Sequence, residues 1–123
     1  MTNLIARTRR PDITFCRSGR INIAARVARV LCLKKGDTIN IANFNGEFLL
    51  FAIQHPPGRH YAQCFPSKNG SLNFCANSVT LARAILNEAR VSASSASFFV
   101  GHPIDIEGTL YLPIITKNPI IRH

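Results

Sequence analysis

The sequence has few acidic residues, no tryptophan and no long apolar run. Six Asp and Glu stand against fifteen Lys and Arg, which gives a formal net charge of +9. The longest uninterrupted apolar stretch, residues 48–53, has six residues, whereas a membrane-spanning helix needs about 20. The first seven residues contain no apolar core of the length that a secretory signal requires. We therefore expect a cytoplasmic protein without a membrane partner.

Recognisable catalytic and metal-binding motifs are also lacking. The four cysteines form no Cys-x-x-Cys pair, and there is no nucleophile elbow, phosphate-binding glycine loop or carboxylate pair. His55, His60, Cys64 and Cys75 could together supply four zinc ligands, but their spacing matches no zinc motif. In an intracellular chain, cysteines inside apolar runs are expected to be reduced and buried. The sequence thus predicts no enzyme, no metal and no cofactor.

Length and composition indicate one compact domain built of short strands. The chain has 123 residues, of which 46% are hydrophobic and 17% charged, with seven Gly and seven Pro. A chain of this size forms one domain, and frequent Gly and Pro favour strands and turns over long helices. Alternating apolar residues predict several strands, and two stripes with helical spacing predict helices near 25–31 and 78–90. We expect a mainly β fold with two short helices.

The ends of the chain differ in composition from its middle. Arg7, Arg9 and Arg10 precede Pro11 with little to bury, which is typical of a mobile basic segment. Three regions are therefore expected: a flexible basic arm at 1–12, a single β-barrel domain at 13–115, and a frayed tail at 116–123.

The two halves of the domain follow the same element order. In 13–53, two strands joined by a Gly turn precede a helix and two further strands, and 60–115 shows the same order. The matching segments are Ala28-Arg29-Val30-Leu31 with Ala82-Arg83-Ala84-Ile85, and the turns Asn45-Gly46 with Glu107-Gly108. Because residue identity is low, any small β-rich domain with two helices can give this appearance. We interpret the pattern as a degenerate internal duplication.

The excess of positive charge is concentrated in the first half. Nine basic and three acidic side chains lie in 1–53, against six and three in 54–123. Such a surface attracts polyanions, nucleic acid first and anionic membrane second. The alternative is a solvated basic surface without a partner, because net charge governs association and not the fold.

Residues 13–53 also resemble the AbrB/SpoVT family of small DNA-binding domains. The resemblance rests on Gly19-Arg20-Ile21-Asn22-Ile23, on a short Arg-bearing helix, and on residues 31–41 with their Leu-Lys-Lys-Gly-Asp turn. Two positions depart from the family pattern: Ala24 stands where proline is usual, and Cys32 where glycine is common. Ala24 still permits a helix to begin, whereas Cys32 must adopt a backbone conformation that glycine takes more easily.

The resemblance implies both a fold and a function. Two hairpins of the family swap strands into one β-barrel, so the repeat implies a swapped-hairpin, double-psi-like β-barrel folded from one chain as a pseudo-dimer. It also implies a transcriptional regulator that binds duplex DNA through Arg residues of the loops and the short helix. The predicted DNA-binding residues are Arg20 and Arg29 from the family pattern, Arg17 and Arg26 by spacing, and Arg7, Arg9 and Arg10 in the basic arm.

Other classes of function are left open by the residues. An antitoxin-like or other protein-interaction module would bind a protein partner through its tail, although this tail holds no acidic residue. A further class is a barrel enzyme, although no constellation of residues supports one, or a mobile-element component without catalytic activity. A homodimer is the alternative to a pseudo-dimer, and for each Arg a solvated side chain or surface ion pair is the alternative to a DNA contact.

Overall fold

The computed structural model describes residues 10–54, 62–68 and 72–121. Arg7, Arg9, His55 and His60 lie outside the described residues. Within them the chain forms nine strands and two helices, in the order β1 (Ile13–Cys16), β2 (Arg20–Ile23), α1 (Ala25–Val30), β3 (Thr38–Phe44), β4 (Glu47–Ile53), β5 (Phe65–Pro66), β6 (Phe74–Asn77), α2 (Val79–Glu88), β7 (Ser95–Val100), β8 (Ile104–Ile106) and β9 (Thr109–Ile121). The expected mainly β fold with two short helices is confirmed.

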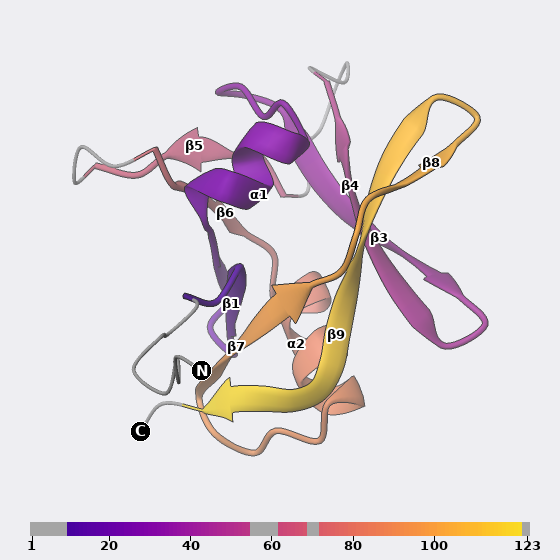
Figure 1. The fold of residues 1–123 in the computed structure, drawn as a ribbon. Coiled ribbons are helices and arrows are strands. Elements are labelled where there is room, and N and C mark those ends of the chain that lie inside the picture. Colours follow the sequence, from indigo (N-terminus) through magenta and orange to yellow (C-terminus); the bar gives the residue numbers. More distant parts are fainter. Residues whose placement is uncertain (1–9, 55–61, 69–71, 122–123) are drawn as a thin grey trace, which may run out of the picture.

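The strands join into one curled antiparallel sheet (Figure 1). Its order is β3-β4-β9-β7-β1-β2-β6-β5, and β8 is added on β9. The two ends of this order come together, because Thr38 in β3 bridges Gln63 just before β5. Next to this bridge, Ile39 N donates a hydrogen bond to Ala62 O at 3.0 Å. The sheet therefore curls around one shared core.

Alternation along the strands directs one face of the sheet into that core. Ile13 and Phe15 of β1 are buried, as are Ile21 and Ile23 of β2, while the residues between them are half-buried. Phe15 packs edge-on against Phe98 of β7, with ring centroids 5.8 Å apart. The helices add their apolar stripes to the same core, namely Val27 and Ala28 of α1 and Ala82, Ile85 and Leu86 of α2.

Both helices end in the same way. Cys32 and Arg90 follow them with φ of 54° and 58°, a left-handed conformation that costs a residue with a Cβ about 1–2 kcal/mol. The residue after each donates its N–H to the carbonyl five positions back, at 2.9 Å in both cases: Leu33 to Ala28, and Val91 to Leu86. This Schellman-type end satisfies carbonyls that the helix leaves unpaired. Cys32 thus adopts the conformation for which glycine is usually selected.

The two helices begin differently. The Ser78 hydroxyl caps α2 by accepting a hydrogen bond from Leu81 N at 3.1 Å. Ala24 precedes α1 and has no side chain that can do the same. Instead, Asn73 Oδ1 accepts from Ala25 N at 2.8 Å. A residue 48 positions along the chain therefore caps α1.

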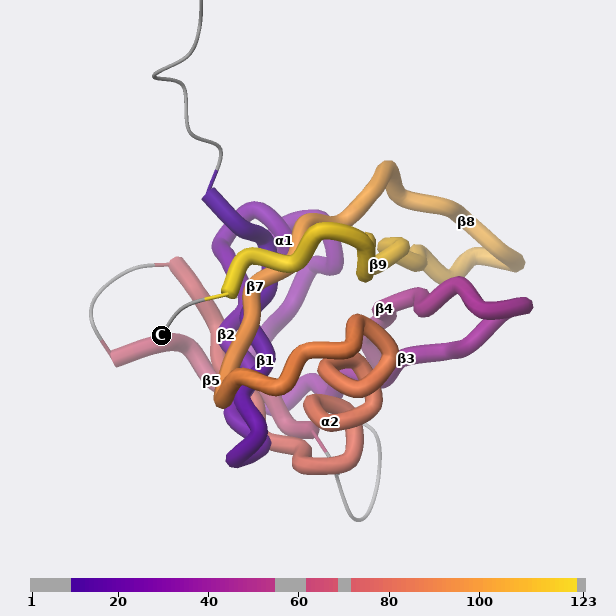
Figure 2. The backbone as a smooth tube through the Cα atoms, turned by 90° about the horizontal axis from the view of Figure 1, so that it is seen from below, coloured from indigo at the N-terminus to yellow at the C-terminus, as the bar shows by residue number. Residues whose placement is uncertain are grey.

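Two hairpins extend from the body on the side away from β1, β2 and β5 (Figures 1 and 2). We call residues 38–53 and 104–116 the hairpin arms. They turn at Asn45-Gly46 and Glu107-Gly108, with φ of 52° and 88° in the first and 52° and 87° in the second, as type I′ turns require. The arms pair with each other through β4 and β9, where Leu50 lies opposite Leu112. Neither arm contains Lys or Arg.

The prediction of a frayed tail at 116–123 is wrong for residues 116–121, the part that the structure describes. β9 continues to Ile121, which lies opposite Ala96 of β7. Apolar residues on both sides of Pro119 favour pairing, and the register between β7 and β9 shifts so that the strand passes Asn118, whose φ is 55°. The C-terminal segment is therefore part of the sheet as far as Ile121.

The basic arm expected at 1–12 does not include Asp12, which belongs to the body. Its side chain is 1% exposed and forms an ion pair with Arg26 of α1. It also accepts a hydrogen bond from Val100 N at 2.8 Å. A buried carboxylate needs such partners to remain charged. Asp12 thereby joins the start of β1 to α1 and β7.

Candidate nucleic-acid interface

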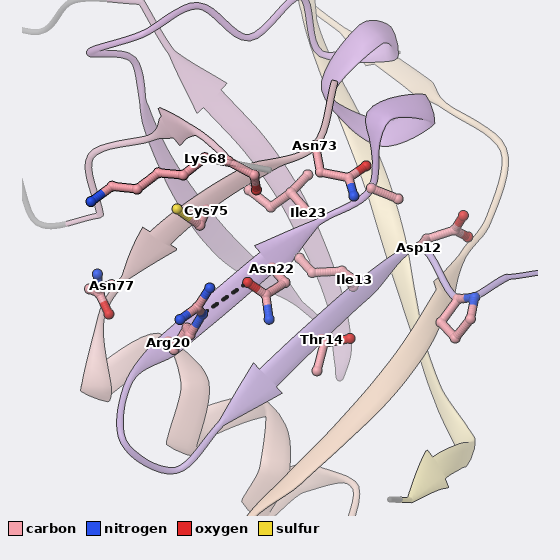
Figure 3. A pocket seen from close by; sticks show the side chains of 13 residues that line it. Asp12, Ile13, Thr14, Arg20, Asn22, Ile23, Lys68, Asn73, Cys75 and Asn77 are labelled. Atoms are coloured by element: carbon pink, nitrogen blue, oxygen red, sulfur yellow. Dashed lines mark hydrogen bonds between the residues drawn. The ribbon is translucent and has the colours of Figure 1, made fainter. Parts of the chain in front are cut away.

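A polar hollow of about 670 Å³ lies over the outer face of β1, β2 and β6 (Figure 3). β2 and β6 pair antiparallel, with Asn22 opposite Cys75 and Arg20 opposite Asn77. Because side chains alternate along a strand, these four point away from the core, and the residues between them on the two strands are buried. Thr14 of β1 lies opposite Asn22 and extends the same row. This row therefore presents amide, hydroxyl and thiol groups to the hollow, whose lining also includes the apolar residues Pro11, Ile13, Ile23 and Ala24.

Two exposed cationic side chains border the polar hollow. Arg20 is at the start of β2, and Lys68 is in the turn between β5 and β6; in Figure 3 they lie on either side of Cys75 and Asn77. Arg20 Nε donates a hydrogen bond to Asn22 Oδ1 at 3.1 Å. This bond uses one of the five donors of the guanidinium and orients it along the face. Arg20 can therefore present a fork of N–H groups to a ligand.

The lining of the polar hollow suits an anion. Its one carboxylate among the described lining residues is Asp12, which is ion-paired with Arg26. Thr14 Oγ1 and Ser97 Oγ share a hydrogen bond of 2.6 Å, which fixes the hydroxyl at the β1 side. No aromatic side chain is among the described lining residues. The hollow can offer charge and hydrogen bonds, but no stacking surface.

The structure gives internal partners to the two Arg residues that were inferred from spacing. Arg17 donates to Ala93 O at 3.1 Å, to Asn87 Oδ1 at 3.4 Å, and to Val91 O. It thus holds the segment that follows α2. Arg26 is the ion-pair partner of Asp12. Both side chains have a structural role that does not depend on DNA.

The two Arg residues that match the family pattern lie in different places. Arg20 borders the polar hollow, whereas Arg29 is on α1 and lines a second hollow between α1 and β6. Arg10 is exposed at the start of the described chain. Lys68 was missed by sequence reasoning, because only the pairing of β6 with β2 brings its turn beside Arg20. No local signal around Lys68 distinguishes it from a solvated turn residue.

The cysteines are less uniform than the sequence suggested. Cys64 is buried, but Cys32 is exposed, and Cys16 and Cys75 are half-buried. The pKa of the Cys64 thiol is raised to about 12, chiefly because the thiol is buried and in smaller part because Asp37 and Cys75 lie nearby. Cys64 therefore remains protonated at neutral pH. Among the residues that the structure describes, no three His, Cys, Asp or Glu side chains come together as metal ligands would.

Comparison with known proteins gives no relative for this chain. No family model, curated protein or solved structure matches it. Over the described residues, neither helix has the length and apolar character needed to cross a bilayer. The function is therefore inferred from the polar hollow and the fold around it.

Proposed function

We propose that the protein binds duplex DNA through the polar hollow, as a transcriptional regulator of AbrB/SpoVT type. The observation that carries this is the outward row of Asn22 and Asn77 flanked by two exposed cations, Arg20 and Lys68. Cationic side chains neutralise phosphates and position the protein, while amides and an Arg fork can read base edges. The +9 charge of the chain adds long-range attraction for a polyanion.

The lining favours a duplex over a single strand. Proteins that hold single-stranded nucleic acid stack its bases on aromatic side chains, which contribute about 1–3 kcal/mol per base. The described lining of the polar hollow has none. In a duplex the bases are already stacked, and the phosphates and groove edges are what a protein can contact. Charged and amide side chains on the outer face of the sheet match these groups.

We further propose that the fold is a swapped-hairpin pseudo-dimer built from the halves 13–53 and 60–115. β2 pairs antiparallel with β6, its counterpart, and β4 pairs antiparallel with β9, its counterpart. Corresponding strands that run side by side in opposite directions are what a twofold relation between two halves produces. The matching helix ends at Cys32 and Arg90 and the matching type I′ turns support the same relation.

The halves also exchange strands, as the swapped-hairpin arrangement requires. β1 of the first half pairs with β7, the strand that follows α2 in the second half. The equivalent contact is the bridge from Gln63, before β5, to Thr38, in the strand that follows α1. Each half therefore completes the sheet of the other. One half alone would leave these edges open, which is why the duplication fits a single chain.

The proposed DNA site is asymmetric. Arg20 is the first residue of β2, and Asn73 takes the corresponding place immediately before β6. The side chain of Asn73 caps α1. The second half contributes Lys68 to the hollow instead. A guanidinium can donate two parallel hydrogen bonds to a guanine, whereas an ammonium acts as a point charge. Asymmetric DNA sites are therefore expected to bind better than palindromes.

Fluorescence anisotropy with a labelled random-sequence duplex of about 20 base pairs tests the proposal. If four to six phosphates are neutralised, log K should fall with log[salt] with a slope of roughly −4 to −5 between about 50 and 300 mM salt. A single-stranded oligonucleotide of the same length should bind more weakly. Equal duplex affinity at the two salt concentrations would exclude the proposed mode of binding.

A matched pair of Lys variants tests whether DNA contacts the polar hollow. Lys68 borders the polar hollow, while Lys117 is exposed on β9 outside it. Lys68→Ala should weaken duplex binding and reduce the salt slope by about 1. Lys117→Ala removes the same charge and should have little effect on either. Equal losses in both variants would show that net charge, and not the hollow, determines binding.

A further inference from the structure

The second hollow, of about 440 Å³, is an apolar groove between α1 and β6. We call it the α1 groove. Its apolar lining consists of Ala25, Ala28, Leu33, Pro66, Leu72 and Phe74. Leu72 is 74% exposed, the largest value among the exposed large apolar side chains of the described residues. A single exposed Leu is ordinary, but one that borders an apolar groove forms part of a patch that another surface can cover.

The polar residues of the α1 groove are cationic or neutral. Arg29 and Lys34 are both exposed and lie in its lining, and no Asp or Glu is among the described lining residues. An apolar floor offers nothing to a phosphate backbone, because it gives neither charge nor hydrogen bonds. The chemistry that fits is an apolar side chain followed by carboxylates.

The chain carries that chemistry on its own surface, at the opposite side of the molecule. β8 reads Ile104-Asp105-Ile106 and is followed by Glu107. Ile104 and Ile106 are 40% and 37% exposed. Among the described strands β8 pairs with β9 alone, so no described strand covers its other edge. Figures 1 and 2 both show β8 far from β5, on whose side the α1 groove lies, so it cannot reach the groove of its own chain.

We propose that the α1 groove binds the β8 segment of a second copy of this chain. Ile104 or Ile106 would enter the apolar floor beside Leu72. Glu107, in the turn that follows β8, would then lie near Arg29 and Lys34, while Asp105 faces the other side of the strand and accepts a hydrogen bond from Gly108 N. The apolar contact removes exposed surface from water, and the charges select the orientation.

Charge explains why two strongly basic copies can meet in this way. Two chains of +9 repel each other on average. The hairpin arms, however, hold no Lys or Arg, and the turn after β8 brings the carboxylate of Glu107 to a cationic rim. The approaching ends are therefore complementary although the whole molecules are not. Because the groove and β8 are different surfaces, the contact is head-to-tail and leads to rings or open chains.

Complementary variants test the contact directly. Leu72→Asp should abolish binding by the α1 groove, and Ile106→Lys should abolish binding by the β8 segment. Both residues are exposed. Wild-type protein should show concentration-dependent association in analytical ultracentrifugation. Each variant alone should sediment as a monomer, because each lacks one of the two surfaces. An equimolar mixture should form a heterodimer through the intact groove of one and the intact β8 of the other.

Several outcomes would overturn the inference. A monomeric wild-type protein at millimolar concentration excludes it. Variants that still self-associate, or a mixture that remains monomeric, would show that another surface is responsible. Val79→Asp is the matched control, since Val79 is 46% exposed on α2 and outside the groove; this variant should associate like the wild type. Circular dichroism of each variant establishes that it is folded.

Discussion

The polar hollow and the hairpin arms differ in charge and in the use of their side chains. The hollow is bordered by Arg20 and Lys68. The arms contain no Lys or Arg, and they carry Glu47, Asp105 and Glu107. In the body, amide and cationic groups are presented outward, whereas in the arms apolar residues of β4 and β9 join the two halves of the sheet. The molecule therefore has one end suited to a polyanion and one end that a polyanion would repel.

This difference shows that basic residues cluster by their place in the fold, and that their position along the sequence does not predict the cluster. The excess of positive charge is larger in 1–53 than in 54–123, which predicted DNA binding centred on the first half. The hollow instead combines Arg20 of the first half with Lys68 of the second. The arms come from both halves and lack basic residues in both.

The largest effect is expected where the arms meet the body. Leu50 is fully buried opposite Leu112, so Leu50→Ala should lower the free energy of unfolding by about 2–5 kcal/mol. Phe44 is 49% exposed further along the arm, with its ring 6.3 Å from that of Tyr111. Phe44→Ala should cost about 1 kcal/mol or less. Urea denaturation of both variants measures the difference, and similar losses would mean that the arm tips are part of the core.

The next effect concerns DNA affinity. Arg20→Ala should weaken duplex binding by about 1–3 kcal/mol if the guanidinium meets a guanine, and by less if it meets phosphate alone. Glu47→Gln raises the net charge by one unit on an arm tip, and should change affinity by no more than about 0.5 kcal/mol. Anisotropy titrations at one salt concentration compare the two. A larger gain for Glu47→Gln than loss for Arg20→Ala would reverse the assignment of the two ends.

Asn73 and Asn77 line the same hollow but have different expected roles, one structural and one facing the ligand. Asn73→Ala removes the cap on Ala25 N and should lower the free energy of unfolding by about 1 kcal/mol. Asn77 is exposed, so Asn77→Ala should leave stability unchanged and weaken DNA binding. Thermal unfolding and anisotropy on both variants provide the test. The opposite pattern would place the DNA contact at the α1 end of the hollow.

The smallest effect is expected at the helix end. Cys32 has a φ of 54°, so Cys32→Gly should raise the free energy of unfolding by up to about 1 kcal/mol. Arg90→Gly, at the equivalent end of α2, should have a similar effect. Chemical denaturation resolves a change of this size. A clear loss of stability in both variants would show that their side chains contribute more than the backbone strain costs.

Local patterns in the sequence predicted the strands and turns, because these depend on residues that are neighbours in the chain. Alternation at 13–15 and 21–23 predicted β1 and β2, and Asn45-Gly46 predicted its hairpin, because side-chain period and turn conformation are local properties. The extension of β9 beyond residue 115 was missed, since Pro119 is unfavourable inside a strand. Pairing of Ala96 with Ile121 overrides that local preference.

The candidate site depends on contacts between distant residues, which a single sequence does not reveal. Arg17 looked like a loop cation, but its acceptors are the carbonyls of Val91 and Ala93. Arg26 was inferred by spacing as a DNA-binding residue of the short helix, but its ion-pair partner is Asp12. Lys68 lies beside Arg20 because β6, the strand that follows its turn, pairs with β2. Residue types indicated a basic surface. Only the fold distinguishes Arg and Lys side chains with partners inside the protein from those that face solvent.

The pairing of β2 with β6 and of β4 with β9 also sets the order in which this protein can fold during synthesis. The ribosome completes β2 and β4 long before it makes β6 and β9. Until then both strands have open edges, and their apolar residues lack the core that buries them. Contacts so distant in sequence form slowly, and open edges attract strands of other chains. A nascent chain that pauses after β4 is therefore more prone to aggregate than one that has reached β9.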